Sequence, residues 1–407
     1  MLIAFGSVPK DGGTFTFYRN IRPMLVDYGI DLRCVSVGKK EAGLWDPTFA
    51  DDGCVLLTQD ASYIKKQSMN FVSWCKANEV DIVLGINSCA ILSALPHIPG
   101  NISVMSRCAN SFDHGYQITI SGYDRLAGIV AQTPRQVKDL TQEYGVDKKL
   151  ITMITNGLDP SPFDSAAQQP RGLRADLQLG FIGRLEHNQK GVLFLPPILE
   201  SLQTKGPPFQ MKIAGKGVHE TTLRKELGPL IENGTVVFCG ALTLSEIPEF
   251  LGQIDVLLFP SQFEGCPNAL LEAMMAGSVP VAWKLEGITD FILQDGKTGF
   301  VVPFKDINAF AQRIEQLHHD RQLLQVMSTA VAKDARERFS HTRMAEDYAK
   351  LFHSVMEKPP PPWTPRPWSE FRVDPAFKQS WRRFIPEPVK KMGRRGMYYL
   401  GLSKRYE

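Results

Sequence analysis

The sequence predicts an α/β protein with two doubly wound domains, each built on a parallel sheet with helices on both faces. Short apolar segments alternate with longer amphipathic segments in both halves of the chain, as is typical of parallel strands joined by crossover helices. A polar, proline-rich stretch, residues 160–176, separates the halves. A chain of 407 residues is long enough for two hydrophobic cores. We therefore expect two facing domains with a ligand cleft between them.

The first half begins with an apolar strand, a Gly12-Gly13 loop and a helix. Its expected strands are 2–5, 31–37, 55–57, 82–86, 102–105, 128–131 and 150–154, and its expected helices include 14–28, 63–78 and 134–144. This pattern assigns residues 1–165 to the first domain and residues 166–176 to a linker.

The second half repeats the alternation from residue 177. Its expected strands are 177–182, 210–214, 236–238, 254–261 and 279–282, and its expected helices are 196–202, 221–231, 247–251, 308–318 and 321–339. We assign residues 177–345 to the second domain, and residues 346–407 to a C-terminal helix with a basic, aromatic tail.

Composition excludes several classes of protein. No apolar run approaches the roughly 18–20 residues that span a bilayer, and the chain starts with a strand rather than a signal peptide, so we expect a cytoplasmic protein. The seven cysteines have no CxxC spacing, which favours reduced thiols over structural zinc. Residues 363–407 hold eleven Lys and Arg against four Asp and Glu, so the net charge of +3 comes from this tail.

The most informative segment is the carboxylate loop, residues 263–268, with the helix that follows it. Glu264 lies in the loop and Glu272 lies eight positions later, one or two turns into the helix. Pro267 suits a first helical position, and Gly265 allows backbone to approach a ligand. Free N–H groups at the helix start and two carboxylates would bind an anion or sugar hydroxyls. The alternative is that the acids only compensate the helix dipole.

A second group of polar residues follows the strand that opens the second half. Arg184 comes directly after Gly183, and Lys190 follows six residues later. These two cations suit a diphosphate, although a solvated loop is the alternative. Gly215-Lys216-Gly217 lacks the Walker A spacing and is more simply a tight turn.

These motifs resemble the family GT4 glycosyltransferases, which are retaining enzymes with the GT-B fold. The resemblance is carried by Glu264 and Glu272 in an E-x7-E spacing, and it is strongest over residues 150–305. Its supporting matches are Thr155-Asn156-Gly157-Leu158-Asp159, Gly183-Arg184-Leu185 with Lys190-Gly191, and residues 295–303. It implies two facing Rossmann-like domains, acceptor side first and donor side second, with the C-terminal segment crossing back to the first domain.

The resemblance also implies roles for individual residues. Arg184 and Lys190 would neutralise the donor diphosphate, Glu264 would hold the donor sugar and Glu272 would hold the ribose. The implied catalytic residues are Arg184, Lys190 and Glu264, and the implied donor-binding residues are Gly12, Gly13, Arg107, Gly265, Cys266, Pro267, Asn268, Ala269, Leu270 and Glu272. No protein nucleophile, metal or cofactor beyond the UDP-, GDP- or ADP-linked sugar is expected. Cys266 also fits a small buried filler.

One position departs from the family pattern. Many members have a His at the end of a first-domain strand, whereas this chain has Arg107 there. Arg107 could bind a phosphate or an acidic acceptor. His114 and Asn110 are candidates for the acceptor side, although His114 could equally be a surface residue.

The expected partners are a nucleotide sugar and a carbohydrate or lipid-linked acceptor, as in synthesis of cell-surface polysaccharide, lipopolysaccharide or glycolipid. Soluble small-molecule or sugar-phosphate acceptors are an alternative. A non-catalytic sugar-nucleotide scaffold would be expected to lose one of the four charged site residues, and an epimerase would turn over donor alone. The 363–407 tail could pack on the first domain or contact an anionic membrane; nucleic acid is not expected.

Overall fold

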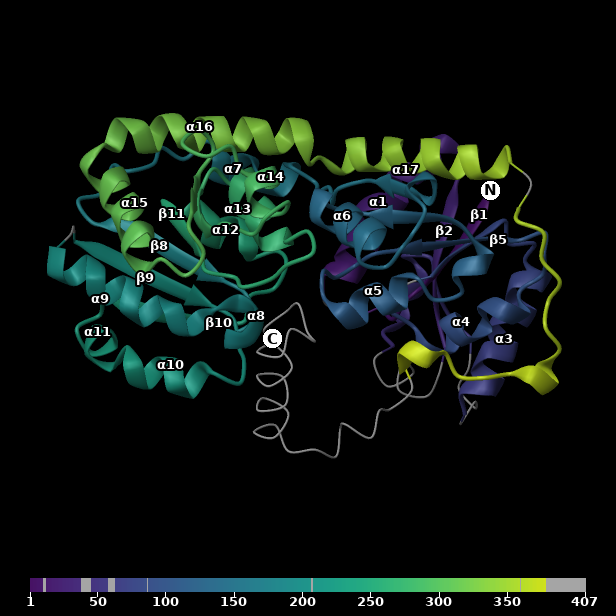
Figure 1. The fold of residues 1–407 in the computed structure, drawn as a ribbon. Coiled ribbons are helices and arrows are strands. Elements are labelled where there is room, and N and C mark those ends of the chain that lie inside the picture. Colours follow the sequence, from purple (N-terminus) through teal and green to yellow (C-terminus); the bar gives the residue numbers. More distant parts are fainter. Residues whose placement is uncertain are drawn as a thin grey trace.

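The computed structural model describes residues 1–9, 12–37, 45–57, 63–85, 87–205, 208–358 and 360–377. Two parallel sheets lie side by side, each with helices on both faces (Figure 1). The predicted fold class, an α/β protein with two doubly wound domains, is therefore confirmed.

The first sheet has the strand order β3-β2-β1-β4-β5-β6-β7, and all its pairings are parallel. Its strands are β1 (Leu2–Gly6), β2 (Asp31–Ser36), β3 (Cys54–Leu56), β4 (Ile82–Gly85), β5 (Ser103–Arg107), β6 (Leu126–Ala131) and β7 (Ile151–Met153). Its helices are α1 (Gly13–Leu25), α3 (Ile64–Ala77), α4 (Cys89–Ala94), α5 (Asp113–Thr119) and α6 (Pro134–Gln142). All seven predicted strands are present. Strands β1, β4, β5 and β6 are largely buried apolar runs, whereas Thr152 and Met153 of the edge strand β7 are exposed.

The second sheet has the order β10-β9-β8-β11-β12-β13. Its strands are β8 (Leu177–Ile182), β9 (Phe209–Ala214), β10 (Val236–Gly240), β11 (Val256–Phe259), β12 (Val279–Trp283) and β13 (Phe300–Val302). Its helices are α7 (Asp164–Ala167), α8 (His187–Lys190), α9 (Leu195–Lys205), α10 (Glu220–Glu226), α11 (Gly228–Glu232), α12 (Ile247–Gly252), α13 (Asn268–Met275), α14 (Thr289–Ile292), α15 (Ile307–His319) and α16 (Arg321–Arg338).

Two local predictions in the second half need correction. The single helix predicted at 221–231 is two helices, α10 and α11, that meet at Leu227. Pro229 lies in the first turn of α11, and a proline within a continuous helix would remove a hydrogen bond there. Pro267 is the N-cap of α13, and the first helical residue is Asn268.

The polar stretch 160–176 is packed against the second domain instead of spanning open space. Phe163 and Ala166 are buried in the same apolar cluster as α12 and α13. The buried Arg171 guanidinium donates to carbonyl oxygens of Ala166, Leu251, Gly252, Ile254 and Ala276. Four of these carbonyls belong to residues 251–276 of the second domain, so Arg171 anchors the stretch to that domain.

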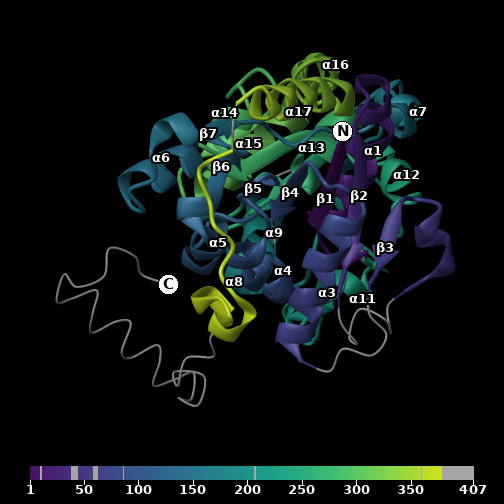
Figure 2. The same ribbon diagram turned by 90° about the vertical axis from the view of Figure 1, so that its right-hand side faces the viewer.

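The chain then returns to the first domain through α17 (His341–Met356), which starts four residues before the boundary drawn at residue 345. Helix α16 lies over the second sheet and α17 over the first (Figures 1 and 2). Met344, Tyr348 and Phe352 of α17 are buried in one core with α1 and β1.

The C-terminal segment 360–377 packs along the first domain (Figure 2). The Trp368 ring stacks on the His97 ring with centroids 4.1 Å apart, and Arg366 donates its N–H to the Pro96 carbonyl at 2.9 Å. This part of the tail therefore follows the packing alternative. Residues 378–407 contain most of the basic and aromatic residues of the 363–407 tail, and they lie outside the described residues. In the described ranges no helix is both long and apolar enough to cross a bilayer.

Candidate active site

The candidate site lies where the strand order of the second sheet reverses. Strands β8 and β11 are neighbours there, although β9 and β10 lie between them in the chain. The loops after β8 and β11 therefore open at one point of the sheet edge, which is where doubly wound folds bind ligands. The first loop carries Arg184 and Lys190, and the second is the carboxylate loop.

Lys190 and Glu264 form a mostly buried ion pair. The Lys190 Nζ lies 2.6 Å from Glu264 Oε1, and their side chains are only 15% and 5% exposed. Lys190 ends the short helix α8, whose N-cap Glu186 accepts backbone N–H bonds from Asn188 and Gln189. Gly191 then turns the chain with φ 64°, and a Cβ there would lie 2.0 Å from the Pro260 carbonyl oxygen. Local backbone constraints thus aim Lys190 at the carboxylate loop.

Gln189 joins Arg184 to the same carboxylate. Arg184 is exposed and donates to Gln189 Oε1, while Gln189 Nε2 is 3.4 Å from Glu264 Oε2. Two cations and one carboxylate therefore share one polar network. Gln189 was missed by the sequence analysis, because an uncharged residue beside Lys190 carries no distinct signal.

Glu272 is the fifth residue of α13 and is partly buried. Among the described residues its carboxylate has no hydrogen-bond partner. Burial raises the pKa of Glu272 to about 7, and the nearby Lys190 opposes this shift. A carboxylate near Lys190 without a hydrogen-bond partner in the described residues is available for ligand hydroxyls.

The other residues of the carboxylate loop and helix start have different environments. Burial raises the pKa of the Cys266 thiol to about 11, which fits a small, neutral filler. The Leu270 side chain is buried in the core, and its N–H already donates to the Pro267 carbonyl. The N–H groups that could face a ligand are therefore those of residues 265, 266, 268 and 269, because Pro267 has none.

The first domain meets the carboxylate loop closely. A Cβ on Gly265 would lie 2.7 Å from the Ala109 carbonyl oxygen, and a Cβ on Gly13 would lie 3.8 Å from Asn268 Nδ2. Gly12, with φ 141°, is the N-cap of α1. The structure therefore brings the predicted Gly12-Gly13 turn opposite the carboxylate loop.

Arg107 is buried and occupied by protein groups. Its Nε donates to Tyr348 Oη at 3.1 Å, its Nη2 donates to Asn156 Oδ1 at 2.6 Å, and its guanidinium lies 4.0 Å from the centre of the Phe17 ring. Asn156 was not among the predicted site residues, although it belongs to the Thr155-Asn156-Gly157 motif. Binding of a donor or acidic acceptor by Arg107 stays a prediction.

His114 and Asn110 lie on or beside α5. His114 is exposed, and its ring centroid lies 6.0 Å from that of Phe377 in the C-terminal segment. The Asn110 carbonyl accepts a hydrogen bond from the Cys108 thiol. The acceptor-side roles of both residues remain predictions.

Two histidines missed by the sequence analysis support α8. His219 Nδ1 accepts the His187 N–H, and His187 Nδ1 accepts the Leu193 N–H, both at 3.2 Å. Burial, followed by the nearby His219 and Lys305, lowers the pKa of His187. A neutral imidazole is required for each acceptor nitrogen, so these residues hold the Lys190 turn in place.

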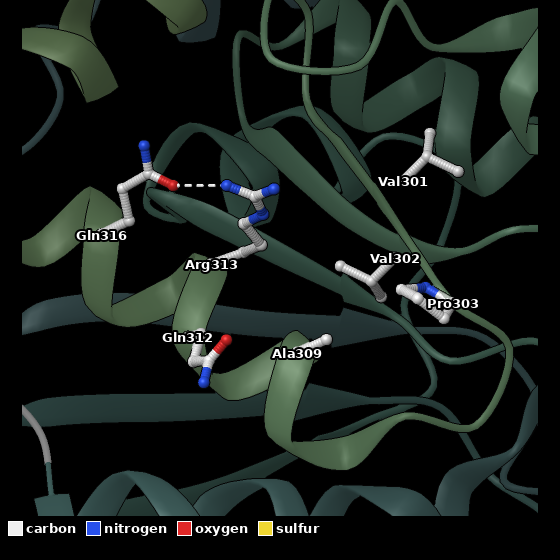
Figure 3. A pocket seen from close by; sticks show the side chains of 7 residues that line it. All are labelled: Val301, Val302, Pro303, Ala309, Gln312, Arg313 and Gln316. Atoms are coloured by element: carbon white, nitrogen blue, oxygen red, sulfur yellow. Dashed lines mark hydrogen bonds between the residues drawn. The ribbon is translucent and has the colours of Figure 1, made fainter.

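A hollow of about 360 Å³ between β13 and α15 is a separate feature (Figure 3). Arg313 donates to Gln316 Oε1 at 2.8 Å and lies over the Phe300 ring. None of the predicted site residues lines this hollow.

Residues 176–320 match the family described as glycosyl transferases group 1. This part of the second domain is therefore similar to the group 1 glycosyltransferases. The resemblance inferred from the E-x7-E spacing is thereby confirmed.

The chain is similar to the 2-deoxystreptamine glucosyltransferase of Streptomyces kanamyceticus, at 28% identity over 41% of this chain and 45% of that protein. It is 30% identical to the putative colanic acid biosynthesis glycosyltransferase WcaL of Escherichia coli over 49% of each chain. The matches span about half the length of these relatives. The crystal structure of HepE from Anabaena in complex with UDP-glucose superposes with a TM-score of 0.70 at 17% identity, covering 87% of this chain and all of that one.

Among the described residues, no three His, Cys, Asp or Glu side chains are grouped as metal ligands would be. Metal independence stays a prediction.

Proposed function

We propose that this protein is a retaining glycosyltransferase that moves a sugar from a nucleoside diphosphate sugar to an acceptor hydroxyl. The observation that carries the proposal is the network of Lys190, Glu264 and Arg184 at the switch point of the second sheet, facing the first domain. Such a network places two cations beside a carboxylate that can accept hydrogen bonds from hydroxyls. A sugar joined to a diphosphate requires both kinds of group at one place.

The donor would lie along this edge of the second sheet. Arg184 and Lys190 would contact the diphosphate, Glu264 and the N–H groups of residues 265, 266, 268 and 269 would contact the sugar, and Glu272 would contact the ribose. When the donor binds, the Lys190 ammonium would interact less with Glu264 and more with the phosphate. The nearly buried pair keeps both charges compensated before the donor arrives, because an isolated charge there would be costly.

The chemistry would require no protein nucleophile. The acceptor oxygen bonds to the anomeric carbon on the face from which the diphosphate oxygen departs, and the acceptor proton passes to that departing oxygen. Arg184 and Lys190 stabilise the negative charge that develops on the leaving diphosphate. A metal ion is not needed for this charge in the proposed mechanism.

Two acceptor classes are supported by the relatives. The similarity to a putative colanic acid biosynthesis enzyme favours a carbohydrate or lipid-linked acceptor in cell-surface polysaccharide synthesis. The similarity to a 2-deoxystreptamine glucosyltransferase favours a soluble small-molecule acceptor as the second candidate. A cytoplasmic location and membrane contact through the 363–407 tail belong to the first alternative.

A thermal-shift panel tests the donor. UDP-, GDP- and ADP-sugars are each added to the purified protein, and the one that matches the site raises the melting temperature, because a ligand of the native state stabilises it. A glucosyl or mannosyl product with the α-configuration of the donor, analysed by NMR, then supports retention. The proposal is wrong if no sugar nucleotide at millimolar concentration shifts the melting temperature.

A further inference from the structure

Asn156 connects the first domain to the carboxylate loop. It follows β7 and is only 7% exposed. Its Nδ2 donates to the Cys266 carbonyl at 3.1 Å and to Asn268 Oδ1 at 2.8 Å, and its Oδ1 accepts from Arg107 Nη2 at 2.6 Å. The guanidinium has only donors, so it fixes which end of the amide faces Arg107. The amide N–H groups therefore point at the carboxylate loop.

Arg107 gives this amide a rigid base. It is 3% exposed and is held by the Tyr348 hydroxyl of α17 and the Phe17 ring of α1. None of its hydrogen bonds within the described residues goes to a carboxylate. Three elements of the first domain, β5, α1 and α17, thus determine where Asn156 can stand.

The carboxylate loop has little room to choose another position. Gly265 approaches the Ala109 carbonyl so closely that no side chain would fit there. The two hydrogen bonds from Asn156 hold the loop on either side of Pro267, directly after Glu264 and Gly265. A shift of the loop would move Glu264 and the N–H groups of residues 265, 266, 268 and 269 together.

We propose that Asn156 is a positioning residue for sugar recognition: through its bonds to Cys266 and Asn268, the first domain sets the geometry of the carboxylate loop that binds the donor sugar. The inference rests on the proposed function, because it takes the carboxylate loop as the sugar site. Asn156 itself does not touch the donor. Its loss weakens the contribution of the sugar to binding and leaves the contribution of the nucleoside diphosphate, which depends on Arg184, Lys190 and Glu272.

A general fastener between the domains would behave differently, and the chain provides one for comparison. Lys138 of α6 and Glu286 of the second domain form an interdomain ion pair at 2.9 Å, with side chains 51% and 68% exposed. Substituting Lys138 removes a domain contact without touching the carboxylate loop. Lys138→Ala is therefore the matched control.

The experiment compares two affinities in each protein by calorimetry. The probes are UDP and UDP-glucose, GDP and GDP-mannose, or ADP and ADP-glucose, according to which pair wild type binds. In Asn156→Ala we expect the nucleoside diphosphate affinity to stay within about twofold of wild type, while the sugar nucleotide affinity falls about tenfold, the size expected for lost polar contacts. Lys138→Ala should change neither.

Asn156→Asp provides a variant of nearly the same shape. The new carboxylate keeps the contact with Arg107. If the Asn268 side-chain amide rotates, its Nδ2 can donate to this carboxylate, but the variant has no donor for the Cys266 carbonyl. Its loss of sugar nucleotide affinity should therefore be smaller than that of Asn156→Ala. Melting temperatures of the free proteins separate this effect from misfolding, and Asn156→Asp serves alone if Asn156→Ala does not fold.

The outcomes distinguish the inference from the proposed function. If wild type binds none of the nucleoside diphosphates, the proposed function fails. If wild type binds them but both Asn156 variants lose the two affinities equally, or lose neither, the positioning role is wrong and the proposed function stands.

Discussion

The two domains share one strand pattern but differ in the chemistry at their switch points. In each sheet the first and fourth strands are neighbours at the centre, β1 with β4 and β8 with β11. In the second domain the loops after these strands carry Arg184, Lys190 and Glu264. In the first domain, the described parts of the matching loops, residues 7–9, 12 and 87–88, are uncharged; Lys10 and Asp11 lie outside the described residues.

In the first domain, by contrast, the candidate cation Arg107 is buried. Arg107 is held by an amide, a phenol and an aromatic ring, whereas Lys190 is held by a carboxylate that also faces the cleft. The shared order of the first six strands therefore fixes where the loops meet but not what they bind. We therefore expect substitutions in the second domain to affect catalysis first and substitutions at Arg107 to affect stability first.

The largest effect is expected at Lys190. Lys190→Ala should lower the rate of sugar transfer by about 10²–10³-fold, because the leaving diphosphate loses a charge partner and Glu264 loses its counter-ion. Initial rates with the donor found in the thermal-shift panel measure the effect. Lys216→Ala, at an exposed cation on the neighbouring Gly-Lys-Gly turn, is the control and should retain transfer. Equal rates for the two variants would remove Lys190 from the catalytic set.

A large effect on stability is expected at Arg107. Arg107→Ala should lower the free energy of unfolding by about 3 kcal/mol, because Asn156 and the buried Tyr348 hydroxyl lose a charged partner. Urea titration measures it, with Lys138→Ala as the reference. A variant as stable as wild type but as slow as Lys190→Ala would reverse the comparison and assign Arg107 to catalysis.

A moderate, pH-dependent effect is expected at Glu272. Its pKa in the folded protein is raised to about 7 from the ordinary 4.5, so the folded state holds more protons than the unfolded state between these values. Stability from this group is therefore present below pH 4.5 and is lost as the pH rises to about 7, by on the order of 1–3 kcal/mol. Unfolding of wild type and Glu272→Gln across pH 5 to 8 checks the sign.

Glu272→Gln should flatten this part of the profile and should be the more stable protein at pH 8, while binding donor more weakly. Glu264→Gln is the matched comparison, because it removes the charge opposite Lys190 instead. If wild type and Glu272→Gln keep the same difference in stability at every pH, the pKa of Glu272 is not raised.

The smallest effect is expected at the exposed interdomain pair. Lys138→Ala should change the free energy of unfolding by no more than about 0.5 kcal/mol, because solvent screens both side chains. A loss several times larger would mean that the domain contact at α6 matters as much as the Asn156 contact.

Much of the fold could be predicted because it depends on local pattern. Short apolar runs located the strands of the first sheet, and a Gly/Pro loop before a helix located Glu264 and Glu272. Local pattern failed at 221–231, where Pro229 divides the predicted helix. It did not indicate how residues 160–176 pack, where Arg171 donates to the carbonyl of Ala166 and to four carbonyls distant in the chain.

The sequence by itself predicted the two-domain α/β class, the resemblance to the GT4 glycosyltransferases and the candidate charged residues of the donor side, because those residues lie within short motifs that follow strands. The tertiary structure alone decided the partners of these residues. Arg107 is 49 positions from Asn156 and 241 positions from Tyr348 in the sequence. Nothing in the residues around them indicates a contact. The fold brings these three residues together from distant parts of the chain. Hydrogen bonding in a buried site then makes the position of each depend on the other two.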